Sequence, residues 1–391
     1  MDGDSSWDVW TSLGSPRYVC SPMVSQSEAA FRMMTRKYGA DLACTPMVHS
    51  RIVLEHPKIM ARVMEDVQFA DDRPLSVQLC GNSPPHFIEA AKALEPFADV
   101  TDINLGCPQG CARSGGYGAF LLEDLSTVVR IVDGLRSHLT KPVSAKIRLL
   151  PSWERTVDTV RALEAAGVAF ICVHGRTRFN TKADTGPCDW EAIRRLREVT
   201  SLPIIANGGI ETHHDIHQCF EATSADAVMS AEALLEDPSL FAHDEHAPAD
   251  PSQSPLAYAH HQLSMAFEYL SFARRYRLEG QEFYATAHVF KILYRLLVCH
   301  LDLTKALDRK GQTLDGIQRV VESLAHRYDY VETHMSQENE IGREYHLGPS
   351  SWYRRHRQRR ETLQGSAAER RAGGGKGMSK AAVSNRLAIF A

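Results

Sequence analysis

The sequence predicts an α/β fold: a closed TIM (β/α)8 barrel followed by a small C-terminal helical domain. Short apolar runs alternate with helical patterns from residue 17 to about 242, at a mean spacing of about thirty residues, the length of a βα unit. Eight such units favour a closed parallel barrel. An open doubly wound sheet is the structural alternative, but no GxGxxG pattern follows the first strand. Beyond Phe241 the texture changes to mostly helix.

Each predicted strand is a short apolar run with turn or helix signals on both sides. In chain order the eight are Tyr18–Ser21, Leu42–Thr45, Leu75–Leu79, Val100–Leu105, Val143–Ile147, Phe170–Val173, Ile204–Ala206 and Ala225–Met229.

Apolar residues at helical spacing predict the inward faces of the helices between these strands. Two such faces are Phe87, Ala90, Ala91 and Leu94, and Val128, Ile131, Val132 and Leu135. The segment Ser25-Gln-Ser-Glu28 resembles a capping box at a helix start, and Gly39 is a stop signal for that helix.

The predicted organisation has five parts: an N-terminal extension 1–16, the barrel 17–242, a linker 243–255, a helical domain 256–331 and a basic, disordered tail 332–391. The linker is acidic and Pro-rich. From Tyr353 onward there are ten Lys/Arg and two Asp/Glu, a net of +8, which leaves −12 on the rest of a chain whose total is −4. Such a tail fits RNA binding, a nuclear signal or a solvated disordered end.

The composition, 43% hydrophobic and 24% charged, is that of an ordinary soluble globular protein. Nine scattered cysteines, an odd number, indicate reduced thiols in the cytoplasm or nucleus. We find no apolar run long enough for a membrane span, and no signal or transit pattern in Met1–Asp8. Cys107 and Cys111 lack companions at zinc spacing, so no metal is expected. We expect a monomer without a membrane partner.

Polar side chains accumulate where the predicted strands end, which is where TIM barrels place their reactive groups. Those at or just after strand ends are Gln78, Asn104, Cys107, Lys146, Arg148, His174, Arg176, Asn207, Gly208 and Gly209. Taken singly, a glutamine is usually a hydrogen-bonded core amide and a cysteine a small buried hydrophobe. A lysine on a strand interior, Lys146, is harder to explain structurally. Their coincidence at one barrel mouth favours an active site.

Two loops predict a phosphate site. Asn207-Gly-Gly209 and Ser230-Ala-Glu232 follow the last two strands, the usual phosphate position of this fold, and each offers backbone N–H groups. A phosphorylated cofactor or substrate is therefore expected. The glycine-rich loop Gly106–Ala119, with Cys107 at its base, looks mobile enough to close over a substrate.

Several motifs, in the same order along residues 17 to 242, resemble the signature of the tRNA-dihydrouridine synthase family. The first are Asp102-Ile-Asn-Leu-Gly-Cys-Pro and Gly115-Gly-Tyr-Gly-Ala-Phe-Leu-Leu. The others are Ser21-Pro-Met-Val, Val77-Gln-Leu, Ala145-Lys-Ile-Arg, Val173-His-Gly-Arg-Thr and Ile205-Ala-Asn-Gly-Gly-Ile. As a set they are highly specific.

Two further segments resemble the eukaryotic branch that acts at tRNA positions 16 and 17: Tyr18-Val-Cys-Ser-Pro-Met-Val and Cys44-Thr-Pro-Met-Val-His. Many bacterial members have Gly-Arg after strand eight, where this chain has Val228-Met-Ser-Ala-Glu-Ala. That departure leaves phosphate binding there to backbone N–H groups.

The resemblance implies FMN as cofactor, NADPH (or NADH) as reductant and tRNA as partner. It assigns the flavin to Pro22, Met23, Val24, Gln78, Lys146, His174, Asn207, Gly208, Gly209, Ala231 and Glu232. Asn104, Arg148 and Arg176 become substrate contacts. Hydride from reduced flavin goes to C6 of a flipped-out uracil, and Cys107 protonates C5.

The resemblance also implies that the helical domain binds tRNA, although its cations otherwise read as a solvated face. These cations and the aromatic residues among them are Arg274, Arg275, Arg277, Lys291, Arg295, Tyr276 and Tyr294. Two alternatives remain from the residues alone. One is an FMN barrel dehydrogenase for a free small molecule such as dihydroorotate or an enone. The other is a non-catalytic RNA-binding barrel.

Overall fold

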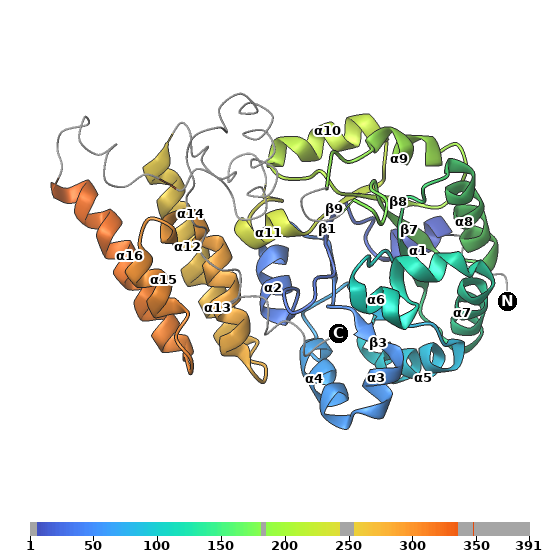
Figure 1. Cartoon of the computed structure of the whole chain (residues 1–391), viewed down its shortest axis with the longest axis horizontal. Helices are drawn as coiled ribbons and strands as arrows, with labels where there is room; N and C mark the ends of the chain where they lie inside the picture. The colour runs from blue at the N-terminus through green and yellow to red at the C-terminus, as the bar shows by residue number, and fades with distance from the viewer. Residues whose placement is uncertain (1–5, 181–184, 243–253, 335–346, 348–391) are drawn as a thin grey trace, which may run out of the picture.

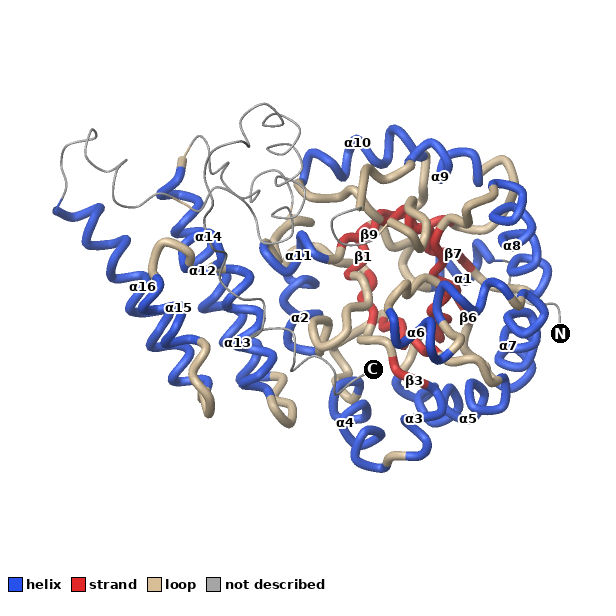
Figure 2. The backbone as a smooth tube through the Cα atoms, in the orientation of Figure 1, coloured by secondary structure: helices blue, strands red, loops and turns tan. Residues whose placement is uncertain are grey.

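The protein folds as a closed parallel β-barrel ringed by helices, with a helical bundle on one side (Figures 1 and 2). This computed structural model describes residues 6–180, 185–242, 254–334 and 347. The strands are β1 Tyr18–Cys20, β2 Leu42–Cys44, β3 Val48–His49, β4 Leu75–Cys80, β5 Val100–Leu105, β6 Val143–Arg148, β7 Phe170–His174, β8 Ile204–Asn207 and β9 Ala227–Ser230. All eight predicted strands are present within two residues of the predicted bounds, and only the two-residue β3 was missed.

The barrel closes because β1 pairs with β9 while β2 pairs with both β1 and β4, all in parallel. The helices around it are α1 Ser6–Ser12, α2 Ala29–Lys37, α3 Ser50–Glu55, α4 Pro57–Val67, α5 Pro84–Leu94, η1 Glu95–Phe97, α6 Gly110–Gly115, η2 Gly118–Glu123, α7 Leu125–His138, α8 Trp153–Ala166, α9 Trp190–Leu196, α10 His213–Thr223 and α11 Glu232–Glu236. The predicted inward faces of α5 and α7 are confirmed, since all eight residues are at most 1% exposed.

Alternate strand residues point into the barrel, as the two-residue period of a strand requires. A separate apolar cluster fills the N-terminal half of the interior with Val19, Leu42, Cys44, Val100, Phe170, Cys172, Ile205, Ala227 and Met229. Trp10 of α1, which is 3% exposed, belongs to this cluster. Its ring packs edge-on against Phe170, with 5.2 Å between the ring centroids. The N-terminal extension thus covers that end of the barrel, and the polar residues face the opposite end.

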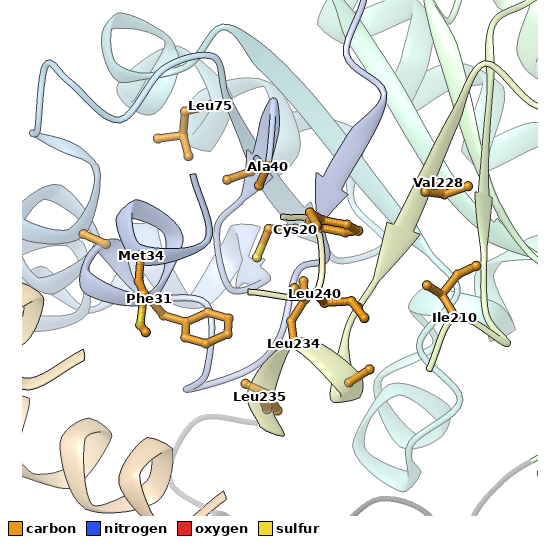
Figure 3. Packing of buried hydrophobic residues seen from close by; sticks show 14 of the residues in the cluster. Cys20, Phe31, Met34, Ala40, Leu75, Ile210, Val228, Leu234, Leu235 and Leu240 are labelled. Carbon is orange, nitrogen blue, oxygen red and sulfur yellow. The ribbon is translucent and has the colours of Figure 1, made fainter. Parts of the chain in front are cut away.

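The helical bundle consists of α12 Pro255–Arg275, α13 Gln281–Ile292, α14 Tyr294–Leu297, α15 Leu301–Leu307 and α16 Leu314–His334. It packs against the barrel chiefly through α2 and α11 (Figure 1). Figure 3 shows buried apolar side chains on the barrel side of this packing, among them Phe31 and Met34 of α2 and Leu234 and Leu235 of α11. The predicted fold class, a TIM barrel followed by a helical region, is confirmed.

A buried polar contact joins the bundle to the first barrel loop. The Glu28 carboxylate accepts from the Tyr269 hydroxyl at 2.7 Å and lies 3.0 Å from His288 Nε2. The predicted capping box is therefore wrong: α2 begins at Ala29, Glu28 is its N-cap residue without a side-chain cap bond, and Ser25 has φ +55°. The local sequence pattern predicted that the Glu28 carboxylate caps the helix start. In the structure that carboxylate instead contacts Tyr269 and His288, which lie far away in the sequence.

We predict that Glu28→Gln lowers the free energy of unfolding near neutral pH by about 1–3 kcal/mol, because the amide leaves His288 with a poorer acceptor. Burial alone raises the pKa of Glu28, but His288 and Tyr269 outweigh it and the net shift is downward. The stabilisation is then present above the unfolded pKa of about 4.3 and lost as the pH falls through and below it. Denaturant unfolding of both proteins at a series of pH values measures this, and a gap that stays constant down to acid pH contradicts it.

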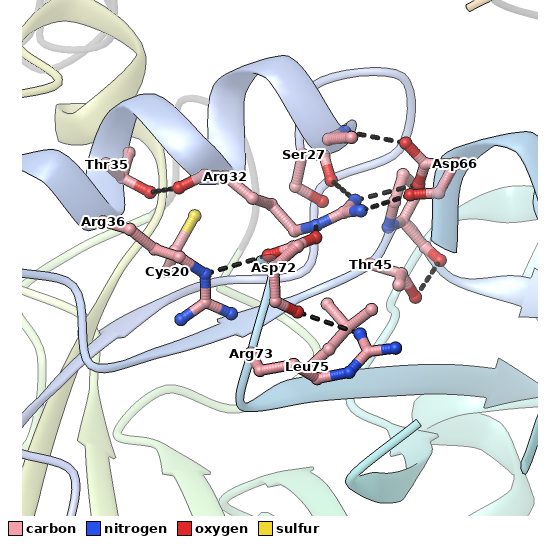
Figure 4. A network of polar contacts seen from close by, with 12 residues as sticks. Cys20, Ser27, Arg32, Thr35, Arg36, Thr45, Asp66, Asp72, Arg73 and Leu75 are labelled. Atoms are coloured by element: carbon pink, nitrogen blue, oxygen red, sulfur yellow. Dashed lines mark hydrogen bonds and ion pairs between the residues drawn. The ribbon is translucent and has the colours of Figure 1, made fainter. Parts of the chain in front are cut away.

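A second buried network lies under the same loop. Arg32 of α2 is fully buried and bonds Asp66 at 2.8 Å, Asp72 at 2.7 Å and the carbonyl of Ser27 at 2.6 Å (Figure 4). Arg36 reaches the other oxygen of Asp72 at 2.8 Å. The network ties α2 and its preceding loop to α4 and to the segment before β4.

Three predicted segments fall largely outside the described residues: the first five residues of the extension, the linker up to residue 253 and almost all of the tail 332–391. The domain boundaries stay predictions. Within the described part of the chain, no helix is both long and apolar enough to cross a membrane.

Candidate active site

The strand register brings the polar interior residues into contact as rows across the barrel mouth. Neighbouring pairs in register are Gln78 with Asp102, Asn104 with Lys146, Arg148 with His174, and His174 with Asn207. All lie toward the carboxyl ends of their strands, above the apolar cluster that holds Trp10. Residues separated by up to 129 positions in the sequence thus share one surface.

A chain of side-chain hydrogen bonds crosses β6, β5 and β4. Ser144 donates to Asp102 at 2.7 Å, Gln78 Nε2 donates to Asp102 at 2.7 Å, and Asn104 Nδ2 donates to Gln78 Oε1 at 2.8 Å. Both ends of the Gln78 amide are engaged, although one of its two amide hydrogens remains for a ligand. Asp102 is buried, and its burial raises its pKa despite those donors. Sequence reasoning gave Asp102 no role; a carboxylate inside a six-residue apolar strand was the available signal.

The network ends at the thiol loop. Asn104 Oδ1 accepts from the backbone N–H groups of Gly106 at 3.2 Å and Cys107 at 3.0 Å, and Ala119 N–H donates to the Cys107 carbonyl at 3.1 Å. This loop, which the sequence predicts to close over a substrate, contains α6 and the start of η2, and its Tyr117 is buried. Asn104 therefore fixes the backbone that carries Cys107.

Cys107 is half-buried in this loop. Burial raises the pKa of its thiol above the ordinary value of 9.0, and the N–H of Gln109 with the cations Arg148 and Lys146 offset this only in part. The thiol is protonated at neutral pH, and those same groups can stabilise the thiolate left after a proton transfer.

Three cations line the mouth, where Asp102 interacts electrostatically with Lys146 and Glu232 with Arg176. Lys146 Nζ donates to Asn207 Oδ1 at 2.9 Å, and Arg148 donates to the carbonyls of Gly106 at 2.9 Å and Thr177 at 3.1 Å. Within the described residues, neither these two nor Arg176 has an ion pair with Asp or Glu. Burial, then Arg176, lowers the pKa of Arg148 to about 10. This surplus positive charge suits an anionic ligand.

The partly buried His174 and the buried Arg176 contact each other next to Lys146 and Arg148. Burial, then Lys146, Arg148 and Arg176, lowers the pKa of His174 well below its ordinary value, so the ring is neutral. Arg176 Nη1 lies 3.3 Å from His174 Nε2. Because a guanidinium only donates, Nε2 accepts and the ring proton is assigned to Nδ1. Arg176 is 7% exposed and also donates to Gly186 at 3.1 Å, so it lies beneath the surface that was expected to meet RNA.

The glycine turn after β8 lies beside His174 at the barrel mouth. Gly208 has φ +97°, and a Cβ there would lie 2.6 Å from the His174 ring. Trp190 Nε1 donates to the Gly208 carbonyl at 2.9 Å, and Asn207 Nδ2 donates to the Met229 carbonyl at 2.9 Å. The Asn207 side chain thus positions Lys146, and any phosphate contact falls to the backbone. Sequence reasoning missed Trp190, whose position two residues after a cysteine gave no signal.

The other predicted cofactor residues frame the mouth. Pro22, Met23 and Val24 form a half-buried turn after β1, closed by the Ser27 hydroxyl, which bonds both the N–H and the carbonyl of Met23 at 3.0 and 3.2 Å. Ala231 is the N-cap residue of α11 and Glu232 its first residue.

A cavity of about 350 Å³ adjoins the mouth. Its walls come from the β2–β3 connection, α3, α4 and the start of the bundle, and include Thr45, Met47, Val63, Leu278 and Tyr284. Thr45 Oγ1 accepts from the Gln78 N–H at 3.1 Å and Met47 Sδ lies 3.5 Å from Asn104 Nδ2. The cavity therefore connects the amide network with the bundle.

A TIM barrel whose open end gathers a thiol, an imidazole and three cations has the groups of an enzyme active site. A family model described as dihydrouridine synthase matches residues 19–297. The chain therefore belongs to the dihydrouridine synthase family, whose members are oxidoreductases.

Named relatives agree with this. The tRNA-dihydrouridine(16/17) synthase [NAD(P)(+)] of Schizosaccharomyces pombe is 37% identical over 77% of this chain and 75% of that protein. The mouse protein named tRNA-dihydrouridine(16/17) synthase [NAD(P)(+)]-like is 35% identical over 81% of this chain and 64% of its own length, just under two thirds. A human relative named tRNA-dihydrouridine(20a/20b) synthase [NAD(P)+]-like is 38% identical over 59% of this chain and 72% of that protein.

Proposed function

We propose that this chain reduces uridine to 5,6-dihydrouridine in the D-loop of tRNA, at positions 16 and 17, with FMN as cofactor and NADPH (or NADH) as reductant. The observation that carries the proposal is the Cys107 thiol on a backbone that Asn104 holds, at a mouth that also gathers Lys146, Arg148 and Arg176. A catalytic acid and an anion-binding surface share one barrel mouth.

The residues present fit FMN. The Gly208 turn packs so closely on His174 that a Cβ would collide with its ring, and the backbone N–H groups of this turn lie at the usual phosphate position of the fold. Lys146, held by Asn207, would contact the flavin and offset the negative charge that reduction develops on it. The turn Pro22–Val24 would lie under the ring, and the neutral His174 offers Nδ1–H as a donor. The backbone of Ala231 and Glu232 would complete the phosphate end.

Bound FMN supplies the hydride that goes to C6 of uracil. Cys107 then donates its proton to C5, because its pKa keeps it protonated until the carbanion character at C5 develops. The thiolate that remains is stabilised by the Gln109 N–H, Arg148 and Lys146. Asn104 holds the acid in place, and the donors of Arg148 not used on Gly106 and Thr177 can fix a uracil carbonyl.

A uracil stacked in RNA cannot reach this mouth, so the target nucleotide must be flipped out. The 350 Å³ cavity supports entry of RNA between the barrel and the bundle, since Leu278 and Tyr284 line it together with Thr45. We therefore include α12–α16 in the tRNA-binding surface.

The bundle's cations are less available than the sequence indicated. Arg274 pairs with Asp315 at 2.9 Å and Arg275 with Asp71 at 3.2 Å. Tyr276 is 2% exposed, so it packs in the core rather than presenting a stacking surface. The bundle would then contribute through Leu278 and Tyr284, which line the 350 Å³ cavity beside the mouth.

Positions 16 and 17 follow from the names of the S. pombe and mouse relatives and from the branch motifs after β1 and β2. The 20a/20b relative has similar identity over a shorter stretch, which makes those positions the alternative. The monomeric state and a cytoplasmic or nuclear location stay predictions.

We predict that the purified protein is yellow and, with NADPH, forms dihydrouridine in unmodified tRNA at positions 16 and 17. Its visible spectrum and position-specific mapping of dihydrouridine by reverse transcription measure this, with tRNA lacking U16 and U17 as the control substrate. Product confined to 20a or 20b contradicts the position. Yellow protein that oxidises NADPH without altering tRNA points to a small-molecule reductase, and colourless inactive protein to a non-catalytic barrel.

A further inference from the structure

A second cavity, of about 190 Å³, opens at the same end of the barrel as Cys107. It lies where β3 passes into α3 and β4 into α5, and Gly115 of α6 forms one wall (Figure 1). The side chains that line it are His49, Ser50, Arg51, Asn82, Ser83 and His86. His49 also lines the larger cavity between the barrel and the bundle.

The lining is cationic and polar. It contains two imidazoles, a guanidinium, two hydroxyls and an amide, and no carboxylate. The carboxylate that Arg51 contacts belongs to Glu55, 3.9 Å away, with both side chains more than half exposed, so that pair is weak. Burial, then Arg51 with His86 nearby, lowers the pKa of His49. The His49 ring is therefore neutral at pH 7, Arg51 is the lining group with a permanent positive charge, and the other lining groups can donate hydrogen bonds to an anion.

Buried polar atoms around the cavity also lack partners. Ser50 is 1% exposed, and its Oγ has no hydrogen-bond partner among the described residues. The Nδ1 atoms of His49 and His86 are buried and equally without one. Such groups are normally satisfied in a folded protein, and three of them belong to residues that line this one cavity.

The cavity wall is also part of the thiol loop. Asn82 Nδ2 donates to the Gly115 carbonyl at 2.9 Å, and the His49 ring packs edge-on against Tyr117 at 5.1 Å between centroids. Both Gly115 and Tyr117 belong to the segment that Asn104 anchors at Cys107. A group bound here lies next to the segment that carries the catalytic thiol.

We propose that this cavity is a phosphate subsite that binds a backbone phosphodiester of the RNA beside the flipped uridine. The inference rests on the proposed function and assigns one phosphodiester of the RNA backbone to this cavity. Phosphate contacts set the register of a nucleic acid on its protein, and here they would hold the target nucleotide over the mouth. The phosphates of the nicotinamide nucleotide are the other possible source of such a group.

The test uses Arg51→Gln in the holoenzyme, with Arg194→Gln as the matched control. Both arginines form an exposed i,i+4 pair with a glutamate, Arg51 with Glu55 and Arg194 with Glu198, but Arg194 lies on the outer helix α9. Binding of unmodified tRNA is measured by filter retention at several salt concentrations, and the KM values for tRNA and NADPH are measured in parallel. We expect Arg51→Gln to weaken tRNA binding and to reduce the slope of log Kd against log salt by about 1, as for one lost phosphate contact. His86→Asn should weaken tRNA binding in the same direction.

A wild-type salt slope in Arg51→Gln, or a slope change equal to that of Arg194→Gln, overturns the subsite. A rise in the KM for NADPH that exceeds the rise for tRNA also overturns it, because the bound phosphate then belongs to the reductant. The binding readout needs no turnover. Wild-type protein that binds tRNA with the expected slope difference but forms no dihydrouridine removes the proposed function and leaves the phosphate subsite standing.

Discussion

Replacing Cys107 by alanine is expected to slow dihydrouridine formation by about 10²–10⁴-fold, the usual contribution of a positioned general acid. The hydride acceptor position C6 is untouched by this change, whereas C5 loses its proton source. Reduction of the bound flavin by NADPH should stay close to the wild-type rate, since the raised pKa of Cys107 concerns only the proton step. Single-turnover assays with pre-reduced enzyme separate the two.

Cys111→Ala is the matched control. It removes another half-buried thiol from the same loop, four residues on, whose Sγ contacts Gln109 at 3.8 Å. Equal losses in the two variants would mean that loop packing and not proton donation limits the reaction. Full activity of Cys107→Ala would assign the acid to another group.

Replacing Arg32 by methionine is expected to lower the free energy of unfolding by about 3–5 kcal/mol, because it leaves Asp66 and Asp72 buried without their shared partner. Burial alone would raise the pKa of Asp72, but Arg32 and Arg36 outweigh it and lower it. The loss should therefore be largest above the carboxylate pKa and shrink in acid. Equilibrium denaturation measures this loss. Flavin retention is a second readout, because Arg32 donates to the Ser27 carbonyl and the Ser27 hydroxyl in turn bonds Met23.

Arg274→Met gives the comparison for this network. Its ion pair with Asp315 is exposed, 39% and 77% for the two side chains, and such pairs contribute about 0–1 kcal/mol. Similar losses for the two variants would show that Arg32 contributes no more than a surface arginine, in spite of its complete burial.

The strands and helix faces could be predicted because their signals are local. A buried strand is a short apolar run, and the inward face of α7 repeats every three to four residues. The glycine-rich segments and polar strand ends placed Asn104, Lys146 and Asn207 at one mouth for the same reason, since a closed barrel brings all strand ends together.

The errors concern partners that lie far away in sequence. Glu28 reads as a helix cap until His288, 260 residues later, accounts for its carboxylate. Arg274 and Arg275 likewise pair with Asp315 and Asp71, partners that the local sequence did not indicate. A sequence pattern gives the chemistry of a side chain, but the fold decides which group meets it.

The rows of interior side chains also constrain how this protein can change. Because inward and outward positions alternate, adding or deleting one residue within β6 would replace Lys146 at the mouth with Ala145 or Ile147 and turn the charge outward. Every mouth-facing group on that strand would be lost at once. Within a strand, therefore, the barrel permits exchange of one side chain for another but no change in the number of residues.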